Sequence, residues 1–273
     1  MTINSLQARN DKNGARKTEF LGLAFDDFSQ DQALKRIGQL LQKSGFSYLV
    51  TPNVDHMVAF NKTANTAMVV AYRHADLVLC DSRILSKLAQ WSGVKLGAVP
   101  GSDLTRMLLQ TEISNRRCAV IGGDAALHAR IGRIYPMFDW TFYGPPMGVL
   151  HDPLARLKIA EFVENSSASI IFFAIGAPQS EITCYEIALR GRATGVALCI
   201  GASLEFLTGA KKRAPYWMQR SALEWLYRLG TEPGRLWRRY LLEGPQIFTI
   251  WRRWHKVTAA RRRVESGSTP FDG

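Results

Sequence analysis

The sequence predicts a doubly wound α/β fold, in which helices cover both faces of a mainly parallel sheet, with a helical segment after it. Short apolar runs of β type alternate with amphipathic stretches over most of the chain. Strands that alternate with helices of about 10–15 residues are typical of βαβ units. The run Ile170–Ile175 is apolar without a break, as expected for a central strand that is buried on both faces. After Gly209 the β-type runs stop, and the pattern becomes helical.

Each predicted strand is a short apolar run. In chain order the strands are expected at Phe20–Phe25, Tyr48–Thr51, Leu77–Cys80, Val94–Val99, Cys118–Ile121, Trp140–Tyr143, Ile170–Ile175 and Val196–Ile200. The segments between them have helical periodicity. The helices are expected at Asp31–Gln42, Thr63–Arg73, Ser102–Thr111, Ala125–Tyr135, Ala155–Glu164 and Glu181–Arg192. This order of elements is Rossmann-like.

The length of 273 residues fits one large domain, or one domain with an appendage. We expect a flexible N-terminus at 1–18, an α/β domain at 19–209, a helical appendage at 210–265 and a disordered tail at 266–273. An apolar fraction of 47% against 21% charged residues argues against a fibrous or disordered chain. The polar start contains no signal-peptide run, and no apolar run is long enough to cross a bilayer.

The four cysteines do not form a Cys-x-x-Cys pair, which argues against a redox motif and a four-thiolate zinc site. All lie in or beside apolar runs, so we expect buried, reduced thiols, as in a reducing cytoplasm. They are Cys80, Cys118, Cys184 and Cys199. The five histidines have no metal-ligand spacing, and no Asp-x-Asp is present, so the sequence supports no metal site.

The net charge of +12 is concentrated in the appendage. Between Lys211 and Arg263 there are 14 lysines and arginines against three acidic residues, together with five of the seven tryptophans. Basic residues interleaved with tryptophan suit a nucleic acid or an anionic membrane surface as a partner. A solvated basic helix without a partner is the alternative, although five tryptophans are costly to expose.

Two helices are expected in the appendage. Pro233 suits the first turn of one helix, and Gly244-Pro245 ends it. The second helix is expected from about Gln246 to Arg263. Its apolar side chains fall on one face, which fits an interfacial helix and equally a helix docked on a core. They are Ile247, Ile250, Trp251 and Trp254.

Small or polar residues follow five of the predicted strands, where an open α/β sheet binds its ligands. They are Thr51-Pro52-Asn53, Asp81-Ser82-Arg83, Gly122-Gly123-Asp124, Gly176-Ala177-Pro178-Gln179 and Gly201-Ala202-Ser203. Glycine at such a turn lets backbone amides approach a phosphate, but tight turns also use glycine for their geometry alone. The Gly-x-Gly-x-x-Gly and Gly-Lys-Ser/Thr fingerprints of dehydrogenases and ATPases are absent.

Asp81 is a candidate general base because it follows an apolar strand. Partial burial there would raise its pKa. Helix capping is an equally good interpretation of an aspartate in this place. Asp103, in Pro100-Gly101-Ser102-Asp103, has the same two interpretations, and capping is favoured for it.

The chain resembles the WecG/TagA/CpsF family of bacterial glycosyltransferases from about Leu21 to Phe248. The most specific matches are Arg213-Ala214-Pro215-Tyr216-Trp217, Leu223-Glu224-Trp225-Leu226-Tyr227-Arg228-Leu229 and Glu232-Pro233-x-Arg235-x-x-x-Arg239-Tyr240. Supporting matches are Thr51-Pro52-Asn53, Ala75-Asp76 leading to Asp81, Pro100-Gly101-Ser102-Asp103-Leu104, Gly122-Gly123, and Gly176-Ala177-Pro178 with Glu181.

The resemblance implies an inverting transfer that needs no metal and no cofactor. A sugar passes from a UDP-sugar to a polyprenyl-diphosphate-linked saccharide in surface polysaccharide or teichoic acid assembly. Residues 19–209 would form the nucleotide-sugar-binding catalytic domain. The basic appendage would dock on the cytoplasmic face of the membrane. Family members can also self-associate, so a homo-oligomer is a further implication.

Residue roles follow from the same resemblance. Asp81 would be the catalytic base, with Thr51 and Asn53 in the same pocket. The substrate-binding candidates are Gly101, Asp103, Gly122, Gly123, Gly176, Gln179, Glu181, Arg213, Arg228, Arg235, Arg238 and Arg239. The arginines are included because guanidinium forks match diphosphate oxygens, which would replace a metal ion.

Three positions depart from the family pattern: Ser82 stands where glycine is usual, Ser180 where a nucleotide-contacting glutamine is expected, and Glu205 where aspartate is common. Two other functions compete with this one. A nucleotide-binding domain with a nucleic-acid-binding tail leaves the Arg213–Trp217 and Leu223–Leu229 motifs unexplained. A nicotinamide-dependent oxidoreductase lacks its glycine fingerprint.

Overall fold

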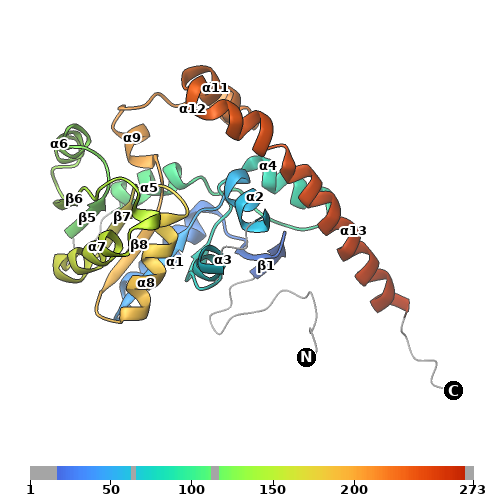
Figure 1. Ribbon diagram of the computed structural model, residues 1–273, viewed down its shortest axis with the longest axis horizontal. Helices are drawn as coiled ribbons and strands as arrows, with labels where there is room; N and C mark the ends of the chain where they lie inside the picture. The colour runs from blue at the N-terminus through green and yellow to red at the C-terminus, as the bar shows by residue number, and fades with distance from the viewer. Residues whose placement is uncertain (1–16, 63–65, 112–116, 268–273) are drawn as a thin grey trace.

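The computed structural model describes residues 17–62, 66–111 and 117–267. Its centre is a six-stranded parallel sheet in the order β4-β3-β8-β7-β5-β6, flanked by helices (Figure 1). The doubly wound α/β prediction is confirmed. The strands are β3 (Phe46–Val50), β4 (Leu77–Val78), β5 (Arg117–Ile121), β6 (Asp139–Tyr143), β7 (Ile170–Phe173) and β8 (Gly195–Cys199).

Two sets of helices cover the two faces of the sheet, because successive strand residues point to opposite sides. In β7, Ile170 and Phe172 pack with one set, and Ile171 and Phe173 pack with the other. The first set is α1 (Gln30–Leu41), α5 (Gly101–Gln110), α6 (Ala125–Ile134) and α9 (Ser203–Leu207). The second set is α2 (Val54–Lys62), α3 (Thr66–Arg73), α4 (Arg83–Trp91), α7 (Pro153–Ser166) and α8 (Gln179–Arg190). A short 3₁₀ turn, η1 (Val149–His151), precedes α7.

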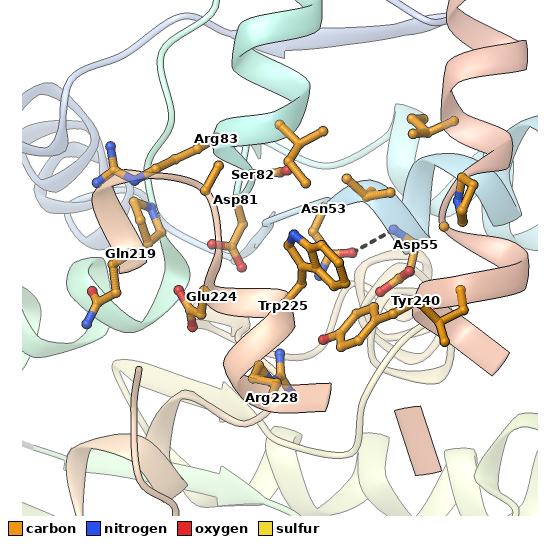
Figure 2. Close-up of a pocket in the computed structure, with 18 of the residues that line it drawn as sticks. Asn53, Asp55, Asp81, Ser82, Arg83, Gln219, Glu224, Trp225, Arg228 and Tyr240 are labelled. Atoms are coloured by element: carbon orange, nitrogen blue, oxygen red, sulfur yellow. Dashed lines mark hydrogen bonds between the residues drawn. The ribbon is translucent and has the colours of Figure 1, made fainter. Parts of the chain in front are cut away.

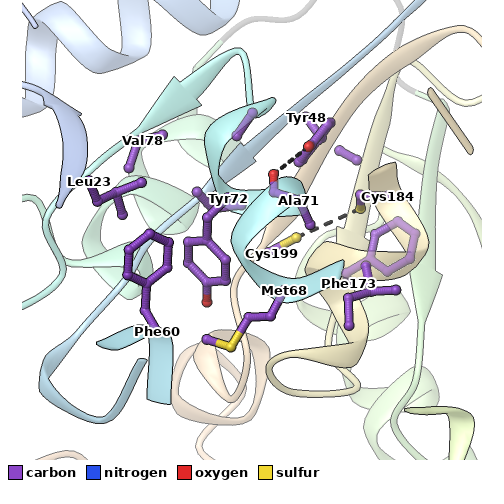
Figure 3. Packing of buried hydrophobic residues seen from close by; sticks show 14 of the residues in the cluster. Leu23, Tyr48, Phe60, Met68, Ala71, Tyr72, Val78, Phe173, Cys184 and Cys199 are labelled. Atoms are coloured by element: carbon purple, nitrogen blue, oxygen red, sulfur yellow. Dashed lines mark hydrogen bonds between the residues drawn. The ribbon is translucent and has the colours of Figure 1, made fainter. Parts of the chain in front are cut away.

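Figure 3 shows part of the core between the sheet and the second set of helices, where β3, β8, α3 and α8 meet. The Tyr48 hydroxyl donates a hydrogen bond of 2.5 Å to the carbonyl oxygen of Ala71. The sulfur atoms of Cys184 and Cys199 lie 3.7 Å apart. All four cysteines are buried free thiols, as predicted.

The predicted strand Phe20–Phe25 is a hairpin of two strands instead, β1 (Lys17–Phe20) and β2 (Leu23–Asp26). Leu21 and Gly22 form its turn, with positive φ angles of 53° and 84°. Two positive φ angles are what a two-residue hairpin turn with the right twist needs. Lys17 and Thr18, which were expected in the flexible N-terminus, belong to β1, and the rest of that segment lies outside the described residues.

The predicted strand Val94–Val99 is wrong, because this segment joins no sheet. Leu96 and Val99 are buried, which explains the apolar pattern. The backbone hydrogen bonds are made elsewhere: Gly97 donates to Oδ1 of Asp27 at 2.8 Å, and Val99 donates to the carbonyl oxygen of Cys80 at 2.8 Å.

The six predicted helices are all present within a few residues of their expected bounds, whereas α2 and α4 were not predicted. The side chains of the residues before them cap both helices. Oδ1 of Asn53 accepts from the backbone N–H of Asp55 at 3.1 Å, and the Ser82 hydroxyl accepts from the N–H of Leu85 at 3.2 Å. Both helices begin a few residues after a strand end. Their capping side chains therefore lie beside the edge of the sheet where α/β folds bind ligands.

The segment after Gly209 is helical, as predicted. Its elements are α10 (Tyr216–Arg220), α11 (Glu224–Thr231), α12 (Pro233–Trp237), a π-helical turn η2 (Arg238–Glu243) and α13 (Gln246–Gly267). Pro233 opens α12, and α13 runs from the top of the molecule past α4 and α2 (Figure 1). Ser266 and Gly267, which were expected in the disordered tail, belong to α13, and the rest of that tail, 268–273, lies outside the described residues. No helix in the described part of the chain is both long enough and apolar enough to cross a membrane.

The apolar face of α13 is docked on the core. Of the two interpretations of this face, an interfacial helix and a helix docked on a core, the interfacial one is therefore wrong. Ile247 is buried, and the Trp254 ring meets Phe20 edge-on with centroids 5.1 Å apart. The indole N–H of Trp251 lies within hydrogen-bonding distance of the carbonyl oxygen of Leu88, at 3.0 Å, and of the Ser92 hydroxyl, at 2.8 Å. These contacts hold the appendage against α4 and the β1–β2 hairpin.

Candidate functional site

The carboxyl ends of β3, β4, β7 and β8 meet at a cavity of about 800 Å³, which we call the polar cavity. The strand order puts these four ends side by side, in the place where α/β sheets bind ligands. Representative lining residues from the strand ends are Thr51, Asp81, Gly176 and Ser203.

The appendage closes the polar cavity with cationic side chains. They are Lys211, Arg213, Arg228, Arg235 and Arg239. Four of the five are held by acidic partners: Glu205 binds Lys211 at 2.8 Å, Asp103 binds Arg213 at 2.5 Å, Glu232 binds Arg235 at 2.6 Å, and Asp55 binds Arg239.

Arg228 differs from the other four cations. Among the residues that the structure describes, no acidic side chain forms an ion pair with its guanidinium, which lies over the Phe206 ring at 5.6 Å. A guanidinium with free donors at the wall of a cavity is suited to the oxygens of a phosphate. Arg228 is therefore the cation of this set that is most available to an anionic ligand.

Asp81 does not cap α4, the helix that follows it, because Ser82 caps that helix. The N–H of Asp81 donates to the carbonyl oxygen of Pro52 at 3.0 Å, which continues the ladder between β3 and β4 past the end of the strand. Its carboxylate accepts a hydrogen bond of 3.3 Å from the N–H of Gly101, at the start of α5. This hydrogen bond fixes the Asp81 side chain, whose exposed part lines the polar cavity.

Burial, and after it the negative charge of Glu224, raises the pKa of Asp81 to about 7. The Gly101 N–H and the cations Arg213 and Arg228 act in the opposite direction. Glu224 is the first residue of α11, and its carboxylate lies near that of Asp81 (Figure 2). A carboxylate that gains and loses a proton near neutral pH is suited to general base catalysis.

A second cavity, of about 400 Å³, adjoins the first, and we call it the apolar cavity (Figure 2). Its apolar wall consists of Val54, Ile84, Trp225, Tyr240, Leu241, Ile247 and Phe248. Seven residues line both cavities: Asn53, Asp55, Asp81, Pro100, Arg213, Glu224 and Arg228. Asp81 and Glu224 therefore stand at the boundary between a polar space, lined by acidic and basic side chains, and an apolar one.

The profile of the glycosyl transferase WecG/TagA/CpsF family matches residues 18–262, which is most of the chain. The chain belongs to the WecG/TagA/CpsF family. It is a glycosyltransferase. Two relatives carry the same name, N-acetylglucosaminyldiphosphoundecaprenol N-acetyl-beta-D-mannosaminyltransferase. The protein from Bacillus spizizenii is 28% identical over 209 residues, 74% of this chain and 77% of its own length. The protein from Staphylococcus aureus is 24% identical over 266 residues, 93% of this chain and 97% of its own length.

Most of the residues predicted for this glycosyltransferase site come together. Those that line one or both cavities are Thr51, Asn53, Asp81, Gly176, Glu181, Arg213, Arg228, Arg235 and Arg239. Gly101 and Asp103 lie behind them, through their bonds to Asp81 and Arg213. The capping interpretation of Asp103 is wrong, because its carboxylate binds Arg213 and Arg106.

Gly101 and Asp103 line neither cavity themselves, and four further predicted residues line neither as well. Gly122 and Gly123 follow β5, the strand next to β7 and outside the four whose ends line the polar cavity, and their positive φ angles are 103° and 78°. A Cβ atom would come within 2.9 Å of Ile175 at Gly122 and within 2.8 Å of Leu127 at Gly123, so the turn itself requires glycine. Gln179 donates from its side-chain amide to the carbonyl oxygen of Ile175, and Arg238 is exposed.

At the floor of the polar cavity, Glu181 was predicted as a site residue, but Tyr72 and His56 near it were not. Glu181 is 2% exposed, and one of its oxygens accepts a hydrogen bond of 3.1 Å from the Tyr72 hydroxyl. Burial raises the pKa of this carboxyl to about 7. His56 lies beside Tyr72, and burial together with Arg239 lowers its pKa to about 3. Neither Tyr72 nor His56 was predicted as a site residue: Tyr72 lies in the helix expected at Thr63–Arg73, and His56 lies in α2, which was not predicted.

Proposed function

We propose that this glycosyltransferase moves a sugar from a UDP-sugar to a polyprenyl-diphosphate-linked saccharide, with inversion and without a metal ion. The observation that carries the proposal is the position of Asp81, whose pKa is raised to about 7, at the boundary between the polar cavity and the apolar cavity. The names of both relatives specify a lipid-diphosphate acceptor, which supports the same acceptor class for this chain.

In this mechanism the UDP-sugar lies in the polar cavity. Asp81 removes the proton from a hydroxyl of the acceptor sugar, and that oxygen attacks the anomeric carbon from the face opposite UDP. The bond from the anomeric carbon to the UDP oxygen breaks, and UDP leaves with the electron pair. Fixed cations stabilise the charge that develops on the diphosphate, with Arg228 as the principal contact and Arg213 beside it.

A panel of UDP-sugars tests the reaction class. The full-length enzyme is incubated with each donor and a short-chain polyprenyl-diphosphate-linked N-acetylglucosamine, in the presence of a chelator. We expect UDP release that depends on the acceptor, and a product with the opposite anomeric configuration. If no donor releases UDP, the proposed transfer is wrong. If the chelator abolishes turnover and a divalent cation restores it, metal independence is wrong.

The pH dependence of transfer reports on Asp81, since a base must be ionised to accept a proton. Activity is therefore expected to fall as the pH drops through a pKa of about 7. Glu224→Gln removes a charge that raises this pKa, so the acid limb of kcat/KM should move to lower pH. Glu243→Gln is the control, because Glu243 lines the polar cavity but is not among the main groups that shift the pKa of Asp81. An acid limb that stays in place, or moves upward, would contradict the role of Glu224.

We also propose that the appendage binds the anionic inner face of the cell membrane. Aromatic side chains on its outer surface support this, since Trp217 is 63% exposed and Trp237 is 46% exposed in a strongly basic segment. Indole rings favour the headgroup region of a bilayer, and lysines and arginines are attracted to anionic lipids. The docked face of α13 is not available for this contact.

Vesicle flotation tests the membrane contact. The double variant Trp217→Asp, Trp237→Asp is expected to lose most of its binding to vesicles that contain phosphatidylglycerol. The double variant Leu154→Asp, Leu189→Asp adds the same charge at two leucines that are also exposed but lie outside the appendage, and it should float as the wild type does. Equal flotation of both variants would refute the contact. Truncation after Gly209 is a poor substitute, because it removes Ile247 and Trp254 from the core.

A further inference from the structure

The apolar cavity is formed where the appendage meets the α/β domain. Val54 of α2 and Ile84 of α4 form one side, and Trp225 of α11 and Tyr240 of η2 form the other. The rings of Trp225 and Tyr240 meet edge-on with centroids 6.2 Å apart (Figure 2). A nucleotide sugar in the polar cavity leaves this space open, so the apolar cavity has room for a second ligand.

The two ends of the apolar cavity differ in chemistry. Its inner end is charged, because Asp81, Glu224 and Arg213 belong to both cavities. Its outer end is apolar and open, because Leu241 and Phe248 line it and are still 52% and 46% exposed. A ligand that fits this gradient has a polar head at Asp81 and an apolar chain that leads outward.

A cation on the same wall adds a further constraint. Arg83 lines the apolar cavity and not the polar one, so it lies on the side of Asp81 that is away from the donor. A guanidinium there suits a phosphate oxygen of a ligand whose polar head lies at Asp81. Figure 2 shows Arg83 and Tyr240 on opposite sides of Asp81, so Arg83 belongs to the charged end of the cavity and not to its apolar end.

We propose that the apolar cavity binds the first isoprene units of the polyprenyl-diphosphate acceptor, with the acceptor sugar held at Asp81. The inference rests on the proposed function and goes beyond it, because it assigns part of the lipid chain to a site within the protein. In such a site the enzyme recognises the start of the hydrocarbon chain as well as the sugar. The rest of the chain stays in the bilayer.

Adjacent leucines provide a matched pair of variants. Leu241 lines the apolar cavity and Leu242 lines neither cavity, and their exposed fractions are 52% and 53%. Leu241→Gln and Leu242→Gln make the same chemical change one residue apart, without adding charge near Asp81. A leucine that meets a ligand over part of its surface contributes on the order of tenfold in affinity.

The experiment compares two soluble acceptors with the same sugar diphosphate, one with a farnesyl chain and one with a methyl group. Leu241→Gln is expected to raise KM for the farnesyl acceptor roughly tenfold. It should leave KM for the methyl acceptor and for the UDP-sugar unchanged, and Leu242→Gln should change none of them. If both variants behave alike, or if Leu241→Gln raises KM equally for both acceptors, the inference is overturned while the wild-type turnover still supports the proposed function.

A binding measurement separates the two proposals if the wild type transfers sugar to neither acceptor. Farnesyl diphosphate is titrated into the full-length wild type and both variants by calorimetry. Binding that weakens only in Leu241→Gln supports an isoprenoid site even though the proposed reaction has failed. Equal binding by all three proteins overturns the site. A single-chain phosphatidylglycerol that displaces farnesyl diphosphate with equal affinity would show a general lipid site and overturn the isoprenoid assignment.

Discussion

Replacement of Asp81 by asparagine is expected to lower kcat by roughly 10²–10⁴-fold, which is the usual contribution of a general base. Asparagine has nearly the same shape, and its carbonyl oxygen can still accept the hydrogen bond from Gly101 that fixes the side chain. It cannot accept a proton from an acceptor hydroxyl. The loss should therefore appear in kcat, whereas the affinity for UDP, measured by calorimetry, stays close to that of the wild type.

The pair of measurements distinguishes catalysis from folding. Loss of both turnover and UDP binding would indicate a damaged site, and the thermal unfolding midpoint would then report whether the fold has changed. Turnover near the wild-type value with UDP still bound would exclude Asp81 as the base. In that case Glu224 is the next carboxylate to test, because it lines the same two cavities.

Replacement of Arg228 by alanine is expected to lower kcat by roughly 10²–10³-fold, the usual effect of removing one preorganised donor from a developing negative charge. Arg228 lines both cavities and forms no ion pair with any residue that the structure describes, so its donors can face the diphosphate. Affinity for UDP should fall as well, because the product carries the same diphosphate.

Arg238→Ala is the matched control for this prediction. Arg238 is exposed on η2, lines neither cavity, and carries the same charge in the same basic appendage. Any effect of net charge on membrane binding is therefore shared by the two variants. Equal losses in Arg228→Ala and Arg238→Ala would show that the appendage acts through its overall charge, and that Arg228 does not stabilise the leaving group.

The parallel sheet was predictable because strands that are buried on both faces must be apolar at every position, as in Ile170–Phe173. The strand predicted at Val94–Val99 is wrong because buried side chains alone produce the same apolar pattern as a strand. Its backbone N–H groups donate to the Asp27 side chain and to the Cys80 carbonyl oxygen, and neither acceptor leaves a periodic pattern in the sequence.

Asp81 could be singled out as a candidate from its place after an apolar strand, but its neighbours could not be predicted. The strand order decides which strand ends are adjacent, and no local pattern contains that information. It puts the end of β5, with Gly122 and Gly123, next to β7 but outside the four strand ends that line the polar cavity. The Leu223–Leu229 motif marked Glu224 and Trp225 as unusual. Their position opposite Asp81 depends on how the appendage docks, which a helical stripe alone does not determine.

The docking of α13 has a consequence for protein engineering. Trp251 bonds to Leu88 and Ser92 at the far end of α4, and the near end of that helix begins one residue after Ser82 and two after Asp81. A chimaera that exchanges only the C-terminal helices between relatives would therefore bring a foreign partner to α4 and shift Asp81. Transplants that alter acceptor choice should carry α4 and the β1–β2 hairpin together with those helices.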